Sequence, residues 1–411
     1  MGKLLFLTGN LPPFSGATSN IVMNVASYLH QKYNYDIVMI GFKTSNDIPK
    51  FDGITFYPIT QTYNPIENFR FIPLWKKILK LILNPSFLLL TLRRKYRTFS
   101  YKSYYKKLIK RALKENPDIE YIIASAFPFD TIVATTSIKT KIPFAEYKLD
   151  PWGTNINLKN KAYHHKIEEN ADKKASAIFV TPIVYKNYVN GMYNVPIHKV
   201  YPLEFPELKE LNILSNQEVN FDDDYVHCSF VGLFYNNIRN PRPLITLFHK
   251  LKDQKIKLHI VGDPAFVKEE CPELLNDNII LHGYQPKHVA NQFLSKSDIL
   301  INLGNANPDQ LPSKLIEYLS FGKPILNVTS TDECPTIPYM EKYPLACTIS
   351  ASTNYGEQTI SKVNSFISNS KGKRLDYKTV ASLFPECTLE YVCEKMYNVI
   401  KEKSEGKNSA K

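Results

Sequence analysis

The stretch NANPDQLPSKLIEYLSFGKP, which runs from residue 305 to residue 324, decides how the second half of the chain is interpreted. A polar loop leads into Pro312, a residue well suited to the first position of a helix. The pattern predicts that this helix continues to about Ser320. Gly322 can close it, because glycine readily adopts the left-handed conformation found after helix ends.

The predicted helix has an apolar side and a polar side. At 3.6 residues per turn, the apolar side is made of Leu315, Ile316 and Leu319. The polar side carries Ser313, Lys314 and Glu317. A hydroxyl and an ammonium beside the free N–H groups of a helix N-terminus suit a diphosphate, and a carboxylate can accept hydrogen bonds from sugar hydroxyls. The stretch therefore indicates a nucleotide-sugar site, with an ordinary amphipathic surface helix as the alternative.

Length and composition indicate a globular protein of two domains. The chain has 411 residues, of which 44% are hydrophobic and 22% are charged. Its six cysteines all lie in the second half without a C-x-x-C pair, which argues against a disulfide framework or a zinc site. The opening MGKLLFLTGNLPPF is too briefly apolar for a signal peptide, and no stretch has the length and freedom from charge of a membrane span. We expect a cytoplasmic protein.

The positive charge is concentrated in one segment. Residues 70–114 contain 14 Lys and Arg and no Asp or Glu, leaving 37 basic against 39 acidic residues elsewhere. Apolar residues share a helical face near residues 74–82, as in helices that lie in a membrane interface. Tyrosines at 96, 101, 104 and 105 also suit an interface. The basic residues expected to reach anionic headgroups include Lys76, Lys77, Lys80, Arg93, Arg94 and Lys95.

Two other interpretations of the basic segment remain. One is a solvated helical hairpin that has no partner. The other is binding of nucleic acid, since basic and aromatic residues also bind single strands, but the segment contains no recognition motif. We therefore expect a membrane surface and no nucleic acid.

The first half is predicted to form a parallel α/β sheet. Strands are expected at residues 3–8, 35–41, 118–126, 142–148 and 177–181. Gly16 lies in the loop after the first strand, where it permits close approach of a ligand or serves as a turn glycine. Asp150 follows the strand at 142–148, where an active-site acid can sit or an Asx turn can begin.

A polar helix follows in the first half. Its HHKIEE sequence comprises His164, His165, Lys166, Ile167, Glu168 and Glu169. The spacing matches no metal-binding motif, so we expect these side chains on the surface.

The second half is predicted to repeat the architecture after a linker at residues 202–224. Strands are expected at residues 228–232, 257–263, 278–286, 298–304 and 324–328, and a last helix at 389–402. Arg239 and Arg242 lie between the first of these strands and its helix. An arginine there can bind a diphosphate, or it can be an ordinary loop residue.

These features resemble GT-B glycosyltransferases of the retaining family 4 (group 1) type. The resemblance is carried by the P-P-x-S-G loop after the first strand, by EENADKKASAIFVTPIVYKNYV, and by PDQLPSKLIEYLSFGKPIL. It implies an α/β fold with two Rossmann-like domains facing a central cleft. Residues 1–205 would form the acceptor-binding domain, with the basic insertion at about 70–114. Residues 206–387 would bind the nucleotide sugar, and a helix at 388–403 would return to the first domain.

The resemblance also implies roles for particular residues. In the family, two acidic residues separated by seven others face the donor sugar and the ribose; here these positions hold Asp309, where the family has glutamate, and Glu317. Arg239 is the best match to a basic residue on the donor phosphates, and Arg242 is a substitute. The arginine that the family places beside Gly232 is absent, and Leu149 stands where a histidine often precedes the acid at 150. The remaining implied donor contacts are Gly16, Gly262, Gly283, Tyr284, Ser313 and Lys314.

The activity implied is transfer of a sugar from a nucleotide-diphosphate sugar to a hydroxyl, with retention of configuration and without a metal or cofactor. Asp309, Arg239, Lys314 and Asp150 would take part in catalysis. The basic segment then suits a glycan or lipid-linked glycan acceptor at the inner face of the cell membrane, as in capsule, O-antigen or exopolysaccharide assembly. Two rivals remain: an inert nucleotide-sugar or glycan-binding module of the same fold, and a nucleotide-sugar 2-epimerase.

Overall fold

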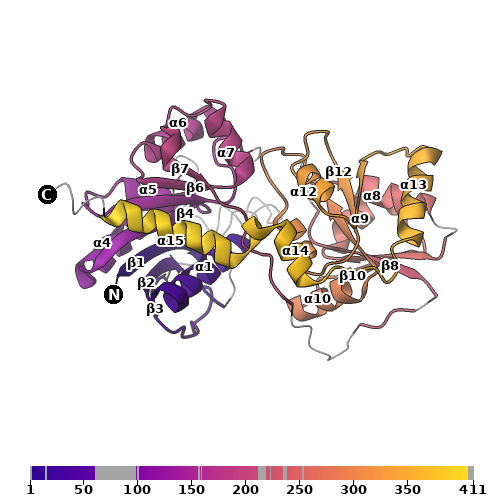
Figure 1. The fold of residues 1–411 in the computed structure, drawn as a ribbon, viewed down its shortest axis with the longest axis horizontal. Helices are drawn as coiled ribbons and strands as arrows, with labels where there is room; N and C mark the ends of the chain where they lie inside the picture. Colours follow the sequence, from indigo (N-terminus) through magenta and orange to yellow (C-terminus); the bar gives the residue numbers. More distant parts are fainter. Residues whose placement is uncertain are drawn as a thin grey trace, which may run out of the picture. The chain divides into compact units, whose positions relative to one another are not determined.

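The computed structural model describes residues 2–13, 16–60, 99, 101–155, 158, 160–211, 219–222, 224–234, 238–251 and 254–405. The chain divides into two compact units (Figure 1). Unit 1 combines residues Met1–Glu204 with Leu389–Lys411, and unit 2 comprises Phe205–Thr388.

Unit 1 is built on a seven-stranded parallel sheet of order β3-β2-β1-β4-β5-β6-β7. The strands are β1 (Lys3–Asn10), β2 (Asp36–Phe42), β3 (Ile54–Ile59), β4 (Ile119–Ser125), β5 (Phe144–Lys148), β6 (Ala177–Val180) and β7 (Val200–Pro202). The five predicted strands are present, and β3 and β7 at the two edges were not predicted. The strand order reverses between β1 and β4, which makes the loops after these strands the expected place for a ligand.

The helices of unit 1 cover both faces of its sheet. α1 (Ala17–Tyr33) packs against β1 and against α15 (Leu389–Glu405), the yellow helix of Figure 1. The Tyr33 and Tyr397 rings of these two helices stack with centroids 3.9 Å apart. The other face shares a hydrophobic core with α4 (Lys102–Glu115), α5 (Asp130–Thr136), α6 (Lys161–Asp172) and α7 (Pro182–Val189), and a 3-10 helix η2 (Ile197–Lys199) precedes β7.

Unit 2 contains a six-stranded parallel sheet of order β10-β9-β8-β11-β12-β13. Its strands are β8 (Val226–Val231), β9 (Ile256–Val261), β10 (Ile279–Gly283), β11 (Ile299–Leu303), β12 (Ile325–Thr329) and β13 (Ala346–Ser350). All five predicted strands are present, and the edge strand β13 was missed. The order reverses between β8 and β11, the counterpart of the β1/β4 position.

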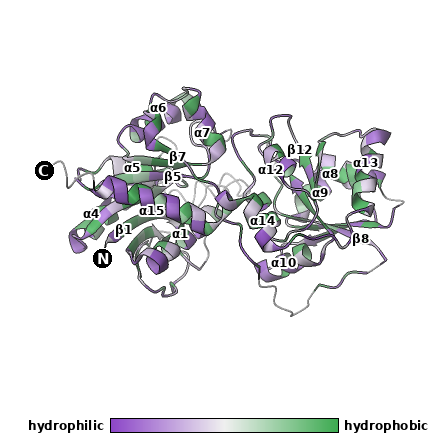
Figure 2. Ribbon diagram, viewed as in Figure 1, coloured by the Kyte–Doolittle hydropathy of each residue, from purple (hydrophilic) through white to green (hydrophobic). Residues whose placement is uncertain are grey.

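Helices alternate with these strands. They are α8 (Arg242–Lys250), α9 (Pro264–Glu270), α10 (Lys287–Lys296), α11 (Ser313–Leu319), α12 (Ile337–Lys342), α13 (Glu357–Ser368) and α14 (Tyr377–Leu383), with 3-10 helices η3 (Pro272–Leu274) and η4 (Pro385–Cys387). Figure 2 shows the sheets largely in green, while the helices carry both purple and green stretches. This is the two-sided pattern of helices that lie between a sheet and water.

The sheet of unit 2 has one apolar and one polar face, because successive strand residues point to opposite sides. The apolar face forms a core with α8, α9 and α13. The opposite face carries polar side chains on five strands, namely His282, His259, His227, Ser229, Asn302 and Asn327. This band of hydrogen-bonding groups is called the neutral band below.

Two predictions about surfaces are corrected. On α6, His164 and Glu168 are 4% and 0% exposed instead of lying on the surface, because both side chains have partners inside unit 1. Tyr101 and Tyr105, predicted to suit a membrane interface, are buried in the core of unit 1. The Tyr105 hydroxyl donates to the carbonyl of Thr8 at 2.6 Å.

Three further predictions concern the cysteines, membrane-spanning helices and the membrane-docking residues. All six cysteines are buried free thiols, as expected of a chain without disulfides. Among the described residues, no helix is both long and apolar enough to cross a membrane. The predicted membrane-docking residues at positions 76, 77, 80, 93, 94 and 95 lie outside the described residues.

Candidate active site

The loops after β8 and β11 meet where the strand order of unit 2 reverses. Arg239 Nη2 donates to Asn305 Oδ1 at 2.8 Å, and the backbone N–H of Ala306 donates to the Ile238 carbonyl at 2.8 Å. The same guanidinium lies beside Gly232, since a Cβ atom placed on that glycine would be 3.6 Å from Arg239 Nη1. Open parallel sheets commonly bind ligands at such a reversal, and Arg239 is the arginine that the structure places there.

The predicted helix after this loop is present as α11. Pro312 precedes it, and its predicted apolar residues are buried. The Tyr318 hydroxyl accepts from the backbone N–H of Val231 at 2.9 Å and donates to its carbonyl at 3.1 Å, which ties α11 to the end of β8. Gly322 has a φ of +65°, as expected for a residue that ends a helix. α11 has only seven residues, so charged side chains rather than its dipole must provide most of the attraction for an anion.

Lys314 and Glu317 form an ion pair on the outer side of α11. Their Nζ and Oε2 atoms are 2.5 Å apart, and the two side chains are 37% and 14% exposed. Glu207 lies in the same electrostatic neighbourhood: burial raises its pKa, Lys209 opposes this, and the charge of Glu317 adds to it. Sequence analysis missed Glu207 because it lies about a hundred residues earlier, in the stretch predicted as a linker.

The loop that carries Asp309 is held by asparagine side chains. Asn305 Nδ2 donates to the Gln310 carbonyl at 3.0 Å, and Asn307 Oδ1 accepts from the Asp309 N–H at 3.1 Å. Asn305 and Asn307 are both buried. Since Asn305 also binds Arg239, one amide side chain fixes the loop of Asp309 to the guanidinium.

Arg242 is directed away from this group. Its Nη1 lies 2.6 Å from Glu273 Oε1, and its Nη2 donates to the Glu270 carbonyl. Arg239 and Arg242 are three residues apart, but the structure brings only Arg239 to the reversal point of the sheet.

The predicted glycines line up at the ends of neighbouring strands. The Gly232 N–H donates to the Val261 carbonyl at 3.0 Å, and the Gly262 N–H donates to the Gly283 carbonyl at 3.0 Å. A Cβ atom on Gly262 would lie 2.0 Å from the Gly232 carbonyl oxygen, so only glycine fits there. Tyr284 follows and is 68% exposed, which leaves its ring available for stacking.

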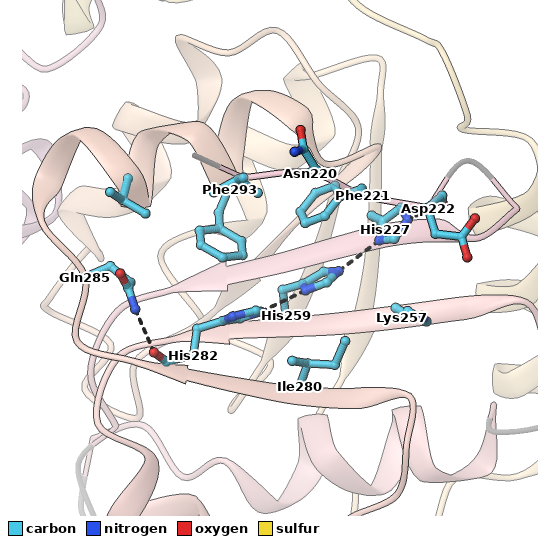
Figure 3. A pocket seen from close by; sticks show the side chains of 12 residues that line it. Asn220, Phe221, Asp222, His227, Lys257, His259, Ile280, His282, Gln285 and Phe293 are labelled. Atoms are coloured by element: carbon cyan, nitrogen blue, oxygen red, sulfur yellow. Dashed lines mark hydrogen bonds between the residues drawn. The ribbon is translucent and has the colours of Figure 1, made fainter. Parts of the chain in front are cut away.

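A cavity of about 510 Å³ lies beside this turn, on the polar face of the sheet (Figure 3). Three imidazoles form a hydrogen-bonded chain in it: His227 Nδ1 to His259 Nε2, and His259 Nδ1 to His282 Nε2, each 2.9 Å long. His227 Nε2 lies 2.7 Å from the Asp222 carbonyl oxygen, which can only accept. We therefore assign the proton to Nε2 in all three rings.

His259, in the middle of the chain, is kept neutral by its surroundings. Burial, reinforced by the neighbouring imidazoles and Lys257, lowers the pKa of His259 to about 3. The ring nitrogens of His227, His259 and His282 point at one another rather than at a common centre. Within the described residues, no group of three or more His, Cys, Asp and Glu side chains could hold a metal ion.

In unit 1, the two predicted site residues lie on different loops. Gly16 precedes α1 and lines a cavity of about 240 Å³ at the ends of β1 and β4. Asp150 lies in the loop after β5 and is not among the residues lining that cavity. Its loop is anchored to α6, because the Gly153 N–H donates to Glu168 Oε2 at 2.7 Å and Trp152 Nε1 donates to His164 Nδ1 at 3.1 Å.

Comparisons with known proteins concern the fold and part of unit 2. Residues 214–341 match the family model described as glycosyl transferases group 1. No match is found among curated protein sequences. Similar solved structures include a sucrose-phosphate synthase from Thermosynechococcus elongatus, at 11% identity and a TM-score of 0.70, with 98% of this chain and 99% of that chain covered.

Two further similar structures have different descriptions. Alr3699/HepE from Anabaena, in complex with UDP and glucose, has 11% identity and a TM-score of 0.61, with 98% of this chain and 100% of that chain covered. A structure described as a UDP-N-acetylglucosamine 2-epimerase from Listeria monocytogenes has 12% identity and a TM-score of 0.59, with 98% and 97% covered.

The fold is therefore GT-B, as the sequence resemblance predicted. The match to the group 1 glycosyltransferase model lies within unit 2 and covers less than a third of the chain.

Proposed function

We propose that this glycosyltransferase moves a sugar from a nucleoside-diphosphate sugar to a hydroxyl of a glycan acceptor, with retention of configuration. The observation that carries the proposal is the placement of Arg239 where the unit 2 sheet reverses, fixed by Asn305 next to the Asp309 loop. A guanidinium held there suits a diphosphate. The UDP and glucose named for the Anabaena structure support this class of donor.

Each residue of the unit 2 site has a proposed role. Arg239 and Lys314 stabilise the charge that develops on the leaving diphosphate, and Glu317 accepts hydrogen bonds from the ribose hydroxyls. Lys314 would exchange its present partner Glu317 for a phosphate oxygen when the donor binds. Asp309 faces the donor sugar, and the turn at Gly283 and Tyr284 holds the base.

Retention requires that the new bond forms on the face that the leaving group vacates. The bond between the anomeric carbon and the diphosphate oxygen breaks, and a bond from that carbon to the acceptor oxygen forms. The acceptor proton passes to the departing diphosphate oxygen. Asp150, after β5 of unit 1, is the proposed acid on the acceptor side. In this scheme the cationic side chains stabilise the leaving group without a metal.

We further propose a lipid-linked glycan as acceptor and the inner face of the cell membrane as the place of action. Support comes from the basic segment, whose described end is α4: its buried face contains Tyr105 and Ile109, and Lys107, Lys110 and Lys114 are exposed. Lysines on one surface attract an anionic leaflet. Flotation with anionic vesicles at low salt should carry the protein upward; protein left at the bottom would reject membrane docking.

The epimerase alternative is supported by similar structures that are described as UDP-N-acetylglucosamine 2-epimerases. Incubation with the donor and analysis of the sugar separates the two activities. An epimerase returns a nucleotide sugar of changed configuration, whereas a transferase releases nucleoside diphosphate. An inert binding module does neither.

A thermal-shift screen with nucleoside-diphosphate sugars tests the donor site. One donor should raise the melting temperature, and Arg239→Ala and Glu317→Ala should abolish that shift. Arg242→Gln is the matched control, since Arg242 pairs with Glu273 instead. If Arg242→Gln abolished the shift while Arg239→Ala kept it, the assignment of the phosphate-binding arginine would be wrong.

A further inference from the structure

The reversal point of the unit 1 sheet has its own cavity, of about 240 Å³, between the loops after β1 and β4. It is lined by Gly9, Asn10, Gly16, Ala17, Thr18, Ser19, Phe42, Phe127 and Pro128. This volume is below the 300–1,000 Å³ typical of sites for drug-sized ligands. The cavity therefore suits a single ring better than a long chain.

Phe127 is the unusual residue of this cavity. It is 49% exposed, although large aromatic side chains contribute most when buried. Its backbone has a φ of +74°, a strained value for a residue other than glycine. Folding gains little from an exposed ring on a strained backbone, which points to a role in binding.

The Phe127 ring is held in place from behind. It meets the Phe129 ring edge-on, with centroids 5.5 Å apart, and Phe129 stacks on Trp152 at 4.6 Å with an angle of 4° between the rings. Phe129 and Trp152 are buried, and Trp152 is hydrogen-bonded to His164 of α6. Phe127 thus ends a supported aromatic stack.

Part of the lining of the cavity is polar. It consists of Asn10 and of the first turn of α1, where Gly16 precedes the helix without a side-chain cap. The Ser19 hydroxyl is already engaged, because it accepts from the Asn10 N–H at 3.1 Å and from Thr8 Oγ1 at 3.2 Å. Hydroxyl groups of a ligand in this cavity would therefore find polar partners at Asn10 and at the start of α1.

We propose that Phe127 is the platform on which a pyranose ring of the acceptor lies, and that it determines acceptor specificity. The C–H face of a pyranose packs on the electron-rich face of an aromatic ring, while its hydroxyls need polar partners such as those that line the same cavity. This inference rests on the proposed glycosyltransferase function and specifies its acceptor as a sugar. It favours a sugar over a lipid chain because a chain would leave the polar lining groups without partners.

The test uses the full-length protein and nuclear magnetic resonance with saturation transfer from aromatic protons. The probes are methyl β-glucoside, methyl β-galactoside, methyl α-mannoside and octyl β-glucoside. At least one methyl glycoside should bind and receive saturation mainly on one ring face. Phe127→Ala should weaken this binding about five- to tenfold, and Phe127→Tyr should stay within about twofold.

Two further variants separate binding from folding. Phe51→Ala removes another exposed phenylalanine of unit 1, 37% exposed and outside the cavity, and should leave binding unchanged. Phe127→Gly should lose binding like alanine while keeping or raising the melting temperature, because glycine tolerates the positive φ. A merely structural role for Phe127 predicts a lower melting temperature in this variant.

Three results would overturn the platform. In the first, no methyl glycoside binds the wild type; in the second, all bind Phe127→Ala as tightly as the wild type. In the third, Phe127→Ala loses only the extra affinity of the octyl glucoside, which would assign the ring to a lipid chain. The donor thermal shift is measured in parallel, so a positive donor shift with any of these results leaves the donor proposal intact.

Discussion

The two sheets of this enzyme bury polar groups in different ways. Under β5 of unit 1 lies a charged cluster, made of Lys148 with Glu146, Glu168 and Asp172, all with side chains that are 0% exposed. Unit 2 instead has the neutral band of histidine, serine and asparagine. Charge is therefore concentrated in one place in unit 1, and uncharged hydrogen bonds are spread over the sheet in unit 2.

The charged cluster contains one cation and three carboxyl groups. Lys148 Nζ lies 2.6 Å from Asp172, 3.0 Å from Glu168 and 3.5 Å from Glu146, and donates to the Tyr188 hydroxyl at 2.6 Å. Burial favours the neutral amine, but Asp172 and Glu168 outweigh it and raise the pKa of Lys148. Burial and the charge of Asp172 raise the pKa of Glu146 far above its ordinary range. Lys148 is thus the positive charge that stabilises the buried acidic side chains of the cluster.

The neutral band combines the chain of three histidines with two separate pairs. Asn302 Nδ2 donates to Asn327 Oδ1 at 2.7 Å, and the Ser229 and Ser297 hydroxyls are 2.5 Å apart. These bonds link strands and helices, whereas the charged cluster also accepts the Gly153 N–H and so holds the loop of Asp150. The difference indicates that buried charge in this enzyme positions a loop of the candidate site, and that the neutral pairs support the sheet.

The largest predicted effect comes from Lys148→Met. Removing the only cation leaves buried carboxylates uncompensated, which should lower the free energy of unfolding by about 3–5 kcal/mol. Urea denaturation at pH 7 measures this. Lys173→Met is the control, because the pair of Lys173 with Glu169 is partly exposed and should contribute little. If Lys148→Met and Lys173→Met lowered the free energy of unfolding equally, the buried cluster would contribute no more to stability than the exposed pair.

The same cluster shows what sequence reasoning can and cannot find. Strands in the middle of the sheets and the α11 helix were predicted because their patterns are local. The partners of Lys148 lie 20 to 40 residues away, so the helix that carries Glu168 looked like a surface helix. A signal was present: Glu146 and Lys148 alternate on one face of the buried strand FAEYK, a pattern that requires buried partners.

The candidate site was predictable to a similar degree. The motif at residues 305–324 located the loop and helix, because the spacing of their residues is fixed by the helix itself. The choice between Arg239 and Arg242 depended on the directions of two side chains in one loop, which the contact with Asn305 and the pair with Glu273 decide. The edge strands β3, β7 and β13 were missed because β3 contains Pro58, β7 has three residues, and β13 mixes polar with apolar residues.

An intermediate effect is predicted for the asparagine pair of the neutral band. Asn302→Leu leaves the buried Asn327 without its donor and should cost about 1–3 kcal/mol. The double variant Asn302→Leu with Asn327→Leu should cost less than the sum of the single changes, since no amide then lacks its partner. Chemical denaturation of the four proteins gives the coupling. If the losses of the two single variants simply added up in the double variant, the Asn302–Asn327 hydrogen bond would contribute nothing to stability.

The smallest effect at pH 7 is predicted for His259→Gln, which should lower the free energy of unfolding by about 1 kcal/mol because hydrogen bonds are lost. The pH dependence of this loss tests whether His259 is buried in its neutral form. The folded-state pKa of His259 is about 3, against an ordinary 6.5. As the pH falls below 6.5, the unfolded chain takes up a proton at His259 that the folded chain does not, so the wild type loses stability. Glutamine does not titrate, and the neighbouring His227, His282 and Lys257 are present in both proteins. The difference in stability between the two proteins should therefore narrow or reverse between pH 6.5 and 4.5 in urea denaturation. Parallel curves would mean that His259 is not buried in its neutral form.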